Sequence, residues 1–295
     1  MQTDKNFVIT VLALGIFVPL WSSGFIAAKY ILPYAEPTTV LALRFSLVAL
    51  LLLLVALVTR SAWPGSWREV GHITVSGILV HGAYLGGVFV SIDLGVPVGL
   101  SALIVSLQPI VTAMLIGPFL GHRLRAAQWV GFFIGTTGVF LVVAPGGVTL
   151  GGGILGLALS VVAVFGISIG TLYQKRYCAY MDLRTGSFIQ FAAAALLMWS
   201  CSIGLETQEI TWTPIFALVL AWLIIMLSIG AVTLLWLMVR YGAAERVASI
   251  FFLVPPVTAV MAWIVFGETM APRAMFGMGL AVVGVFIVSR KIQPA

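Results

Sequence analysis

Ten continuous apolar runs, each about as long as a lipid bilayer is thick, constrain this chain more than any other feature. A membrane-spanning helix needs about 20 mainly apolar residues. Ten stretches meet that length: 7–28, 37–59, 70–92, 97–119, 126–145, 150–173, 184–204, 213–238, 243–265 and 271–289. Their apolar residues are continuous rather than alternating, which excludes the strands of a membrane barrel. The sequence therefore predicts an all-α membrane protein with ten transmembrane helices.

The scarcity of charge supports this fold class. Only 8% of the 295 residues are charged, whereas a soluble domain carries about 25%. The net charge of +6 does not indicate nucleic-acid binding, because the basic residues stand singly between apolar runs. Cys178 and Cys201 have neither metal-ligand spacing nor a nearby histidine. We therefore expect a lipid-facing protein with no metal, no cofactor and no nucleic-acid partner.

The distribution of Lys and Arg predicts the orientation. With ten helices, both termini lie on one side of the membrane. That side holds twelve basic residues: Lys5, Arg60, Arg68, Arg123, Arg125, Lys175, Arg176, Arg184, Arg240, Arg246, Arg290 and Lys291. The other side holds three: Lys29, Arg44 and Arg273. Because cytoplasmic connections carry the excess of Lys and Arg, we expect a bacterial inner-membrane protein with both termini in the cytoplasm.

The chain also resembles itself. A shift of 146 residues, without gaps, aligns Ser22 with Ser168, Lys29 with Lys175, Pro109 with Pro255, Gly121 with Gly267 and Gly138 with Gly284. Each half holds five predicted helices, so the second half starts on the opposite side and the repeats are inverted. We therefore predict two five-helix repeats, 1–146 and 147–295, joined in one membrane domain. Inverted repeats are typical of secondary transporters, in which the substrate binds near the bilayer midplane between the halves.

Prolines interrupt three of the runs. Pro19 removes a backbone donor from the first run, and Pro109 does so in the fourth. Pro255 and Pro256 stand at the repeat position of Pro109 in the ninth run. Broken helices at matching places in two inverted halves indicate a transport site, and a packing kink is the alternative.

Polar side chains inside the runs are the candidate site residues, because polar groups in lipid are costly and must face inward. We predict that five residues line a central cavity and contact the substrate: Ser22, His81, Tyr84, Gln108 and Trp236. We also expect Lys29, at the end of the first run, to act at a gate. The structural alternatives are a hydrogen-bonded core histidine for His81, an interfacial side chain for Lys29 and an aromatic belt residue for Trp236.

The segment PPVTAVMAWIVFGETM at 255–270, followed by Gly277 and Gly284, resembles the repeat signature of the drug/metabolite transporter superfamily. The first half carries a weaker copy from Gln108 to Gly138, in which His122 stands where the second half has Glu268. The resemblance extends over nearly the whole chain and includes the first-helix segment WSSGF at 21–25. It points to the ten-helix exporter branch and, within it, to bacterial aromatic amino-acid exporters.

The absence of acidic residues near the middle of the predicted spans, together with the absence of enzyme motifs, argues against several classes of function. No run has Glu or Asp near its middle, which argues against cationic substrates and carboxylate-based proton coupling. Enzyme motifs such as His-Glu-x-x-His and a P-loop are absent, and phosphate carriers would need more deep basic residues than Arg44. We therefore expect export of small neutral or zwitterionic metabolites, aromatic amino acids in particular, by alternating access. The alternatives are a carrier or exporter of other metabolites or drugs and, less favoured, a membrane channel. The sequence defines neither the coupling ion nor the oligomeric state.

Overall fold

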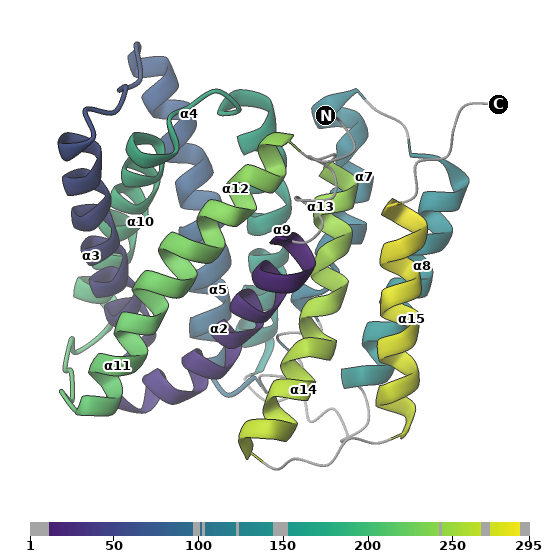
Figure 1. Ribbon diagram of the computed structural model, residues 1–295. Coiled ribbons are helices and arrows are strands. Elements are labelled where there is room, and N and C mark those ends of the chain that lie inside the picture. Colours follow the sequence, from purple (N-terminus) through teal and green to yellow (C-terminus); the bar gives the residue numbers. More distant parts are fainter. Residues whose placement is uncertain are drawn as a thin grey trace.

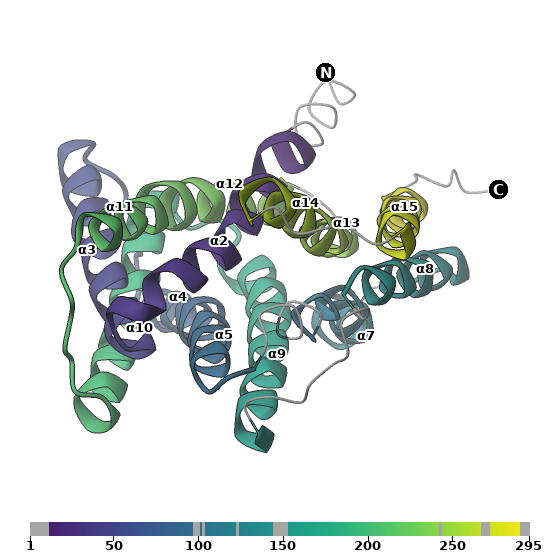
Figure 2. The same ribbon diagram turned by 90° about the horizontal axis from the view of Figure 1, so that it is seen from below.

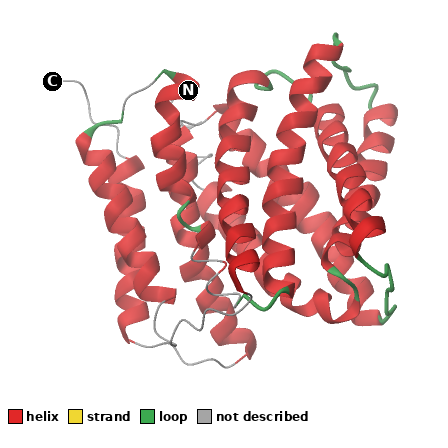
Figure 3. Cartoon of the chain, turned by 180° about the vertical axis from the view of Figure 1, so that it is seen from behind, coloured by secondary structure: helices red, strands yellow, loops and turns green. Residues whose placement is uncertain are grey.

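The structure is a computed structural model that describes residues 12–96, 101, 104–121, 124–143, 153–241, 244–266 and 272–289. In these ranges the chain is helical, and its only strand-like feature is an isolated bridge between Ala35 and Ile210. The prediction of an all-α membrane protein is confirmed. Figure 3 shows the described helices joined by loops at the two ends of the bundle.

Six helices within the described ranges are long and apolar enough to cross a membrane. Three of them are α3 (Pro37–Val58), α9 (Gly153–Tyr177) and α10 (Leu183–Leu205). The other three are composite: η1 (Leu12–Phe17), α2 (Val18–Ile31) and η2 (Leu32–Tyr34); α4 (Trp67–Gly77), η3 (Ile78–Ala83) and α5 (Tyr84–Asp93); α11 (Pro214–Trp222), η5 (Leu223–Ala231) and α12 (Val232–Tyr241).

The other four predicted spans contain shorter apolar helices. The fourth and fifth runs contain α7 (Gln108–Leu120) and α8 (Ala126–Val143). The ninth contains α13 (Ala244–Ile250), η6 (Phe251–Leu253) and α14 (Val254–Phe266), and the tenth contains α15 (Pro272–Ser289). Their apolar parts are 10–17 residues long in the described ranges.

Two long helix pairs lie at opposite edges of the bundle. Figures 1 and 2 show α3 beside α10 at one edge and α8 beside α15 at the other. Between them lie α2, α5, α7, α9, α12 and α14 (Figure 2). The larger apolar core fills this middle region and extends to α3 and α10, whereas a small separate cluster lies around Phe132 and Phe252. A buried binding site can therefore form among the side chains of these central helices.

Two glutamates join α3 to α10 at one end of the bundle. The Glu206 carboxylate accepts hydrogen bonds from the backbone N–H groups of Thr38 (2.8 Å) and Thr39 (2.7 Å). Glu36 in turn accepts from the backbone N–H of Thr207 (2.6 Å). The Thr207 hydroxyl, which also donates to Glu36, is the largest cause of the lowered pKa of this carboxyl. The bonds to Glu206 satisfy two of the free N–H groups at the start of α3.

Glycines let α8 and α15 approach until their backbones touch. A Cβ atom at Gly284 would lie 2.6 Å from the Cα atom of Gly135, and one at Gly138 would lie 2.5 Å from the backbone nitrogen of Ala281. Small residues at a helix interface permit this approach in membranes, where dispersion contacts drive helix association. The α8–α15 pair is therefore held by close packing.

We expect Gly284→Ala to destabilise the protein, because the added methyl group forces α8 and α15 apart. The cost should be about 1–3 kcal/mol, as is typical of overpacking, and should appear as a lower melting temperature in detergent. Gly279→Ala on the same helix is the control, because nothing lies within 4 Å of its Cβ position. It should be neutral or slightly stabilising, since alanine favours a helix over glycine. Equal melting temperatures for the two variants would contradict close packing.

Candidate functional site

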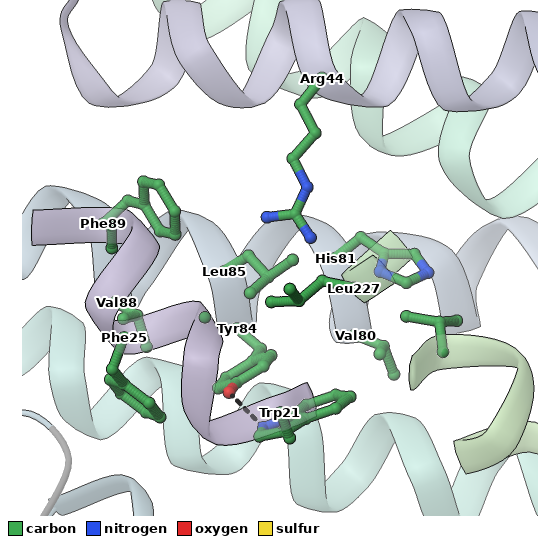
Figure 4. A pocket seen from close by; sticks show the side chains of 13 residues that line it. Trp21, Phe25, Arg44, Val80, His81, Tyr84, Leu85, Val88, Phe89 and Leu227 are labelled. Atoms are coloured by element: carbon green, nitrogen blue, oxygen red, sulfur yellow. Dashed lines mark hydrogen bonds between the residues drawn. The ribbon is translucent and has the colours of Figure 1, made fainter. Parts of the chain in front are cut away.

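A small cavity lies among four composite or long helices in the middle of the bundle. Its volume is about 40 Å³, which is room for about two or three water molecules. Thirteen residues line it: Trp21, Gly24, Phe25 and Ala28 of α2, Arg44 of α3, Val80 and His81 of η3, Tyr84, Leu85, Val88 and Phe89 of α5, Leu227 of η5, and Val232 of α12. Figure 4 shows Arg44 and the aromatic side chains from different helices converging on this space.

One face of α2 forms a wall of the cavity. Trp21, Gly24, Phe25 and Ala28 are spaced as neighbours on one side of a helix. This face extends about 10 Å along the helix axis. Gly24 permits a close approach to η5, because a Cβ atom there would lie 2.5 Å from Cδ2 of Leu227.

Two π-helical segments border the cavity. η3 carries His81, and η5 carries Leu227. The wider π-helical turn is rare and occurs frequently at functional sites. A shift of 146 residues moves 78–83, the range of η3, to 224–229, which lies within η5. The same local irregularity therefore occurs at corresponding places in the two halves.

Arg44 places a guanidinium group inside the protein. The side chain is only 2% exposed, and its Nε donates a hydrogen bond to Ser228 Oγ at 2.9 Å. Figure 4 shows the guanidinium extending from α3 toward Leu227 and His81. Among the described residues, no carboxylate lies within ion-pair distance of it. A buried charge without an opposite charge is costly, which makes Arg44 a functional candidate.

His81 lies beside Arg44 with its hydrogen-bonding capacity unused. It is 1% exposed, and neither ring nitrogen has a partner among the described residues. Its ring stacks on Phe191 with centroids 4.0 Å apart and contacts Phe45 with centroids 6.0 Å apart. Aromatic packing therefore holds the imidazole in place, while both of its buried nitrogens stay without a hydrogen-bond partner among the described residues.

The indole of Trp21 and the phenol of Tyr84 close the aromatic side of the cavity. Trp21 Nε1 donates to the Tyr84 hydroxyl at 3.2 Å, and the two rings are nearly parallel with centroids 6.0 Å apart. Phe251 packs edge-on against Trp21 at 5.3 Å. Because the Tyr84 hydroxyl accepts this bond, its own proton can be donated to a ligand.

The five predicted substrate contacts do not form one group. His81 and Tyr84 line the cavity, whereas Ser22 is buried on another side of α2, where its hydroxyl donates to the backbone oxygen of Val254 at 3.2 Å. Trp236 is buried in the main apolar core, and its Nε1 has no partner among the described residues.

Gln108 borders a second and smaller cavity of about 10 Å³. Thr112 and Thr171 line the same space. Gln108 Oε1 and Thr112 Oγ1 have no partner among the described residues. The backbone oxygen of Gln108 accepts from the hydroxyl of Ser168 at 3.4 Å. This smaller cavity borders α9 and α12, and it shares no lining residue with the larger cavity.

The prolines lie at irregular places in the helices. Pro19 follows the π-helical turn η1, and Pro109 follows a turn at 106–107 that precedes α7. Pro255 and Pro256 follow the 3₁₀ turn η6 and are buried. Lys29 is exposed near the end of α2. The signature residues His122, Gly267 and Glu268 lie outside the described residues.

Sequence reasoning missed Arg44 and Trp21 as cavity residues. The sequence feature that indicates Arg44 is its position, because it is the one basic residue deep inside a predicted span. The feature that indicates Trp21 is its spacing, since Trp21, Gly24, Phe25 and Ala28 lie on one face of a helix. The polar residues of the first run favour the face of Ser22 instead.

Comparisons with known proteins identify relatives along the whole chain. A family model described as the EamA-like transporter family matches residues 7–144 and 154–290. The uncharacterized inner membrane transporter YedA of Escherichia coli strain K12 is 24% identical over 92% of this chain and 87% of its own length. A "Probable amino-acid metabolite efflux pump" of the same strain is 25% identical over 94% of this chain and 93% of its own.

A solved crystal structure has the same fold. It matches with a TM-score of 0.78 over 96% of this chain and 97% of the other chain, at 18% sequence identity. At this identity the match shows the fold alone. The family match confirms the resemblance to the drug/metabolite transporter superfamily.

We expect His81→Phe to stabilise the protein in the absence of a ligand. The phenyl ring keeps the contact with Phe191 and removes two buried nitrogens that lack partners, each of which costs about 1–3 kcal/mol when it is left unsatisfied. The melting temperature in detergent should rise by several degrees. The matched control is His72→Phe, which removes a partnered nitrogen, because His72 Nδ1 lies 2.6 Å from the Tyr173 hydroxyl. The control should not be stabilised, and a fall for His81→Phe would show that the ring nitrogens are satisfied in solution.

Proposed function

This chain belongs to the EamA-like transporter family, and we propose that it is a secondary transporter that exports small neutral or zwitterionic metabolites by alternating access. Amino acids, and aromatic ones in particular, are the favoured substrates. The observation that carries this proposal is the buried cavity in which aromatic rings surround Arg44 and His81. Aromatic walls with a few fixed polar groups suit a small molecule that has a charged end and an apolar side chain.

The depth of the cavity supports a transport role. His81 lies near the middle of the helix Trp67–Asp93, and Ser228, the partner of Arg44, lies near the middle of Pro214–Tyr241. Secondary transporters bind their substrates near the bilayer midplane. The relative named as an amino-acid metabolite efflux pump supports amino acids as the substrate class.

Two hydrogen bonds support an inverted repeat. Ser22 donates to the backbone oxygen of Val254 (3.2 Å), and Ser168 donates to that of Gln108 (3.4 Å). Both the donors and the acceptors differ by 146 residues, and each acceptor directly precedes a proline. Several helices obey the same shift: α7 (Gln108–Leu120) corresponds to α14 (Val254–Phe266), and α8 (Ala126–Val143) corresponds to α15 (Pro272–Ser289).

We propose from this correspondence that the halves are related by a two-fold axis in the membrane plane, with five helices in each. Two such halves have two near-equivalent arrangements, each of which opens the site to one side. The inner-membrane relative supports a bacterial inner membrane as the location, and the Lys and Arg distribution supports cytoplasmic termini.

The repeat also supports a gate at Lys29. Its counterpart Lys175 donates from Nζ to the backbone oxygen of Val239 at 2.7 Å, which ties α9 to α12 at one end of the bundle. Subtracting 146 from these positions gives Lys29 and Asp93 at the other end. Lys29 would therefore close that end by pairing with Asp93 when the transporter adopts its second arrangement.

We expect the purified protein in proteoliposomes to transport radiolabelled amino acids from a panel that includes phenylalanine, tyrosine and tryptophan. His81→Ala and Tyr84→Ala should reduce transport several-fold at near-normal membrane abundance, because both side chains line the cavity. Trp67→Ala is the control, since Trp67 is exposed at the start of α4, and it should transport normally. Failure of the wild type to move any amino acid would contradict the substrate class. Normal transport by both cavity variants would show that the substrate binds elsewhere.

Charge exchange tests the proposed gate. Lys29→Asp and Asp93→Lys should each slow transport, because each places like charges at the pair. The double exchange should restore at least part of the rate, since it recreates an opposite-charge pair. The control combines Lys175→Asp with Asp93→Lys, two positions that are not proposed to pair. Its transport rate should not recover. A double exchange no better than the single variants would rule out the pair.

A further inference from the structure

We propose that Arg44 is the receptor for the carboxylate group of a zwitterionic substrate, so that the transporter selects organic molecules that carry one carboxylate, such as amino acids. This inference rests on the proposed function, because it names the chemical class recognised in the same cavity. It adds a specificity-determining residue that the resemblance to known transporters does not assign.

The geometry leaves the guanidinium available for such a ligand. Its Nε is used by Ser228, and no described residue accepts from its two terminal nitrogens. A planar fork of N–H donors matches the two oxygens of a carboxylate and gives a short, charge-assisted pair. The cavity volume of about 40 Å³ leaves room for water to hydrate the group when no substrate is bound. A bound carboxylate would replace that water.

The surroundings favour a monocarboxylate over other anions. Arg44 is the one permanent cation in the lining, and the other polar members are His81 and Tyr84. A phosphate dianion would need more positive charge than one guanidinium supplies. The remaining wall, along Trp21, Phe25 and Phe89, is apolar and suits an organic side chain rather than a bare inorganic ion.

His81 and Tyr84 complete the recognition. The Tyr84 hydroxyl has a proton to donate to a carboxylate oxygen, because it accepts its bond from Trp21. A neutral imidazole offers one acceptor and one donor, and both His81 nitrogens lack partners among the described residues. The acceptor nitrogen suits the ammonium of an amino acid, whereas the lining contains no carboxylate that would bind a cation alone.

The corresponding site of the other half argues against a structural role for Arg44. Adding 146 to its number gives Gln190, whose amide nitrogen donates to Gln174 Oε1 (2.8 Å) and Ser76 Oγ (3.2 Å). The counterpart of His81 is Leu227. The second half thus has a neutral residue with a hydrogen-bonded amide nitrogen at the position where the first half has a charge without a carboxylate partner. The fold therefore accepts glutamine here, which makes Arg44→Gln a suitable variant.

The test measures binding separately from transport. Thermal shift of the purified protein is recorded with four probes: L-phenylalanine, 3-phenylpropionate, L-phenylalaninamide and phenethylamine. The first two carry a carboxylate, and the last two do not. The wild type should be stabilised by the two carboxylates only. Arg44→Gln should bind them at least tenfold more weakly, as loss of a charge-assisted hydrogen bond implies, and Arg44→Lys should be intermediate.

Two controls separate recognition from folding. Arg184→Gln removes a basic residue that pairs with Asp182 at 2.9 Å outside the cavity, and it should bind as the wild type does. Arg44→Gln without ligand should melt at or above the wild-type temperature, because it removes an unpaired buried charge. A large fall in that temperature would show a structural role and would overturn the proposal.

The remaining outcomes are also decisive. Equal binding of acids and amides by the wild type, or unchanged carboxylate binding by Arg44→Gln, overturns the proposal. A wild type that is stabilised by none of the probes overturns it as well. Carboxylates that bind through Arg44 but are not carried across proteoliposomes support the receptor and contradict the transport function instead.

Discussion

The requirement that polar groups inside the bilayer find partners within the protein governs this structure. Lipid offers no hydrogen bonds, so each unsatisfied group costs several kcal/mol. The serine hydroxyls of Ser22 and Ser168 therefore bond to backbone oxygens of neighbouring helices, and Gln190 bonds to Ser76 and Gln174. Against this background, a polar group that is left without a partner is informative, because the protein retains it at a cost in stability.

Several of the unsatisfied groups lie near the helix irregularities. His81 lies in the π-helical segment η3, and Gln108 and Thr112 lie in the first turns of α7, directly after the break at 106–107. Thr258, the counterpart of Thr112 after a shift of 146 residues, also has a buried hydroxyl without a partner. Broken and widened helices thus coincide with polar groups that have unused bonding capacity, as expected where a helix lines a cavity rather than lipid.

The two edge pairs are held by different contacts. α8 and α15 meet through glycines at backbone contact, whereas α3 and α10 are joined through Glu36 and Glu206 at one end. Each pair combines one helix of the first half with one of the second, so the two halves interlock at both edges. The central helices contact one another through aromatic side chains and single hydrogen bonds around the cavity.

The helical membrane class, the family and the positions of most helices can be predicted from the amino-acid sequence. These follow from the length and apolarity of each run, which are local properties, and from a signature that needs no contacts. The sequence also identified His81 and Tyr84, because a histidine and a tyrosine deep in one span are unusual wherever the helix packs. Tertiary packing sets which face of each helix lines the cavity. It turned Trp21 inward instead of Ser22, buried Trp236 away from the lining and directed Arg44 to Ser228. The rotation of a helix about its axis depends on contacts with neighbours far away in the chain, so no local pattern fixes it.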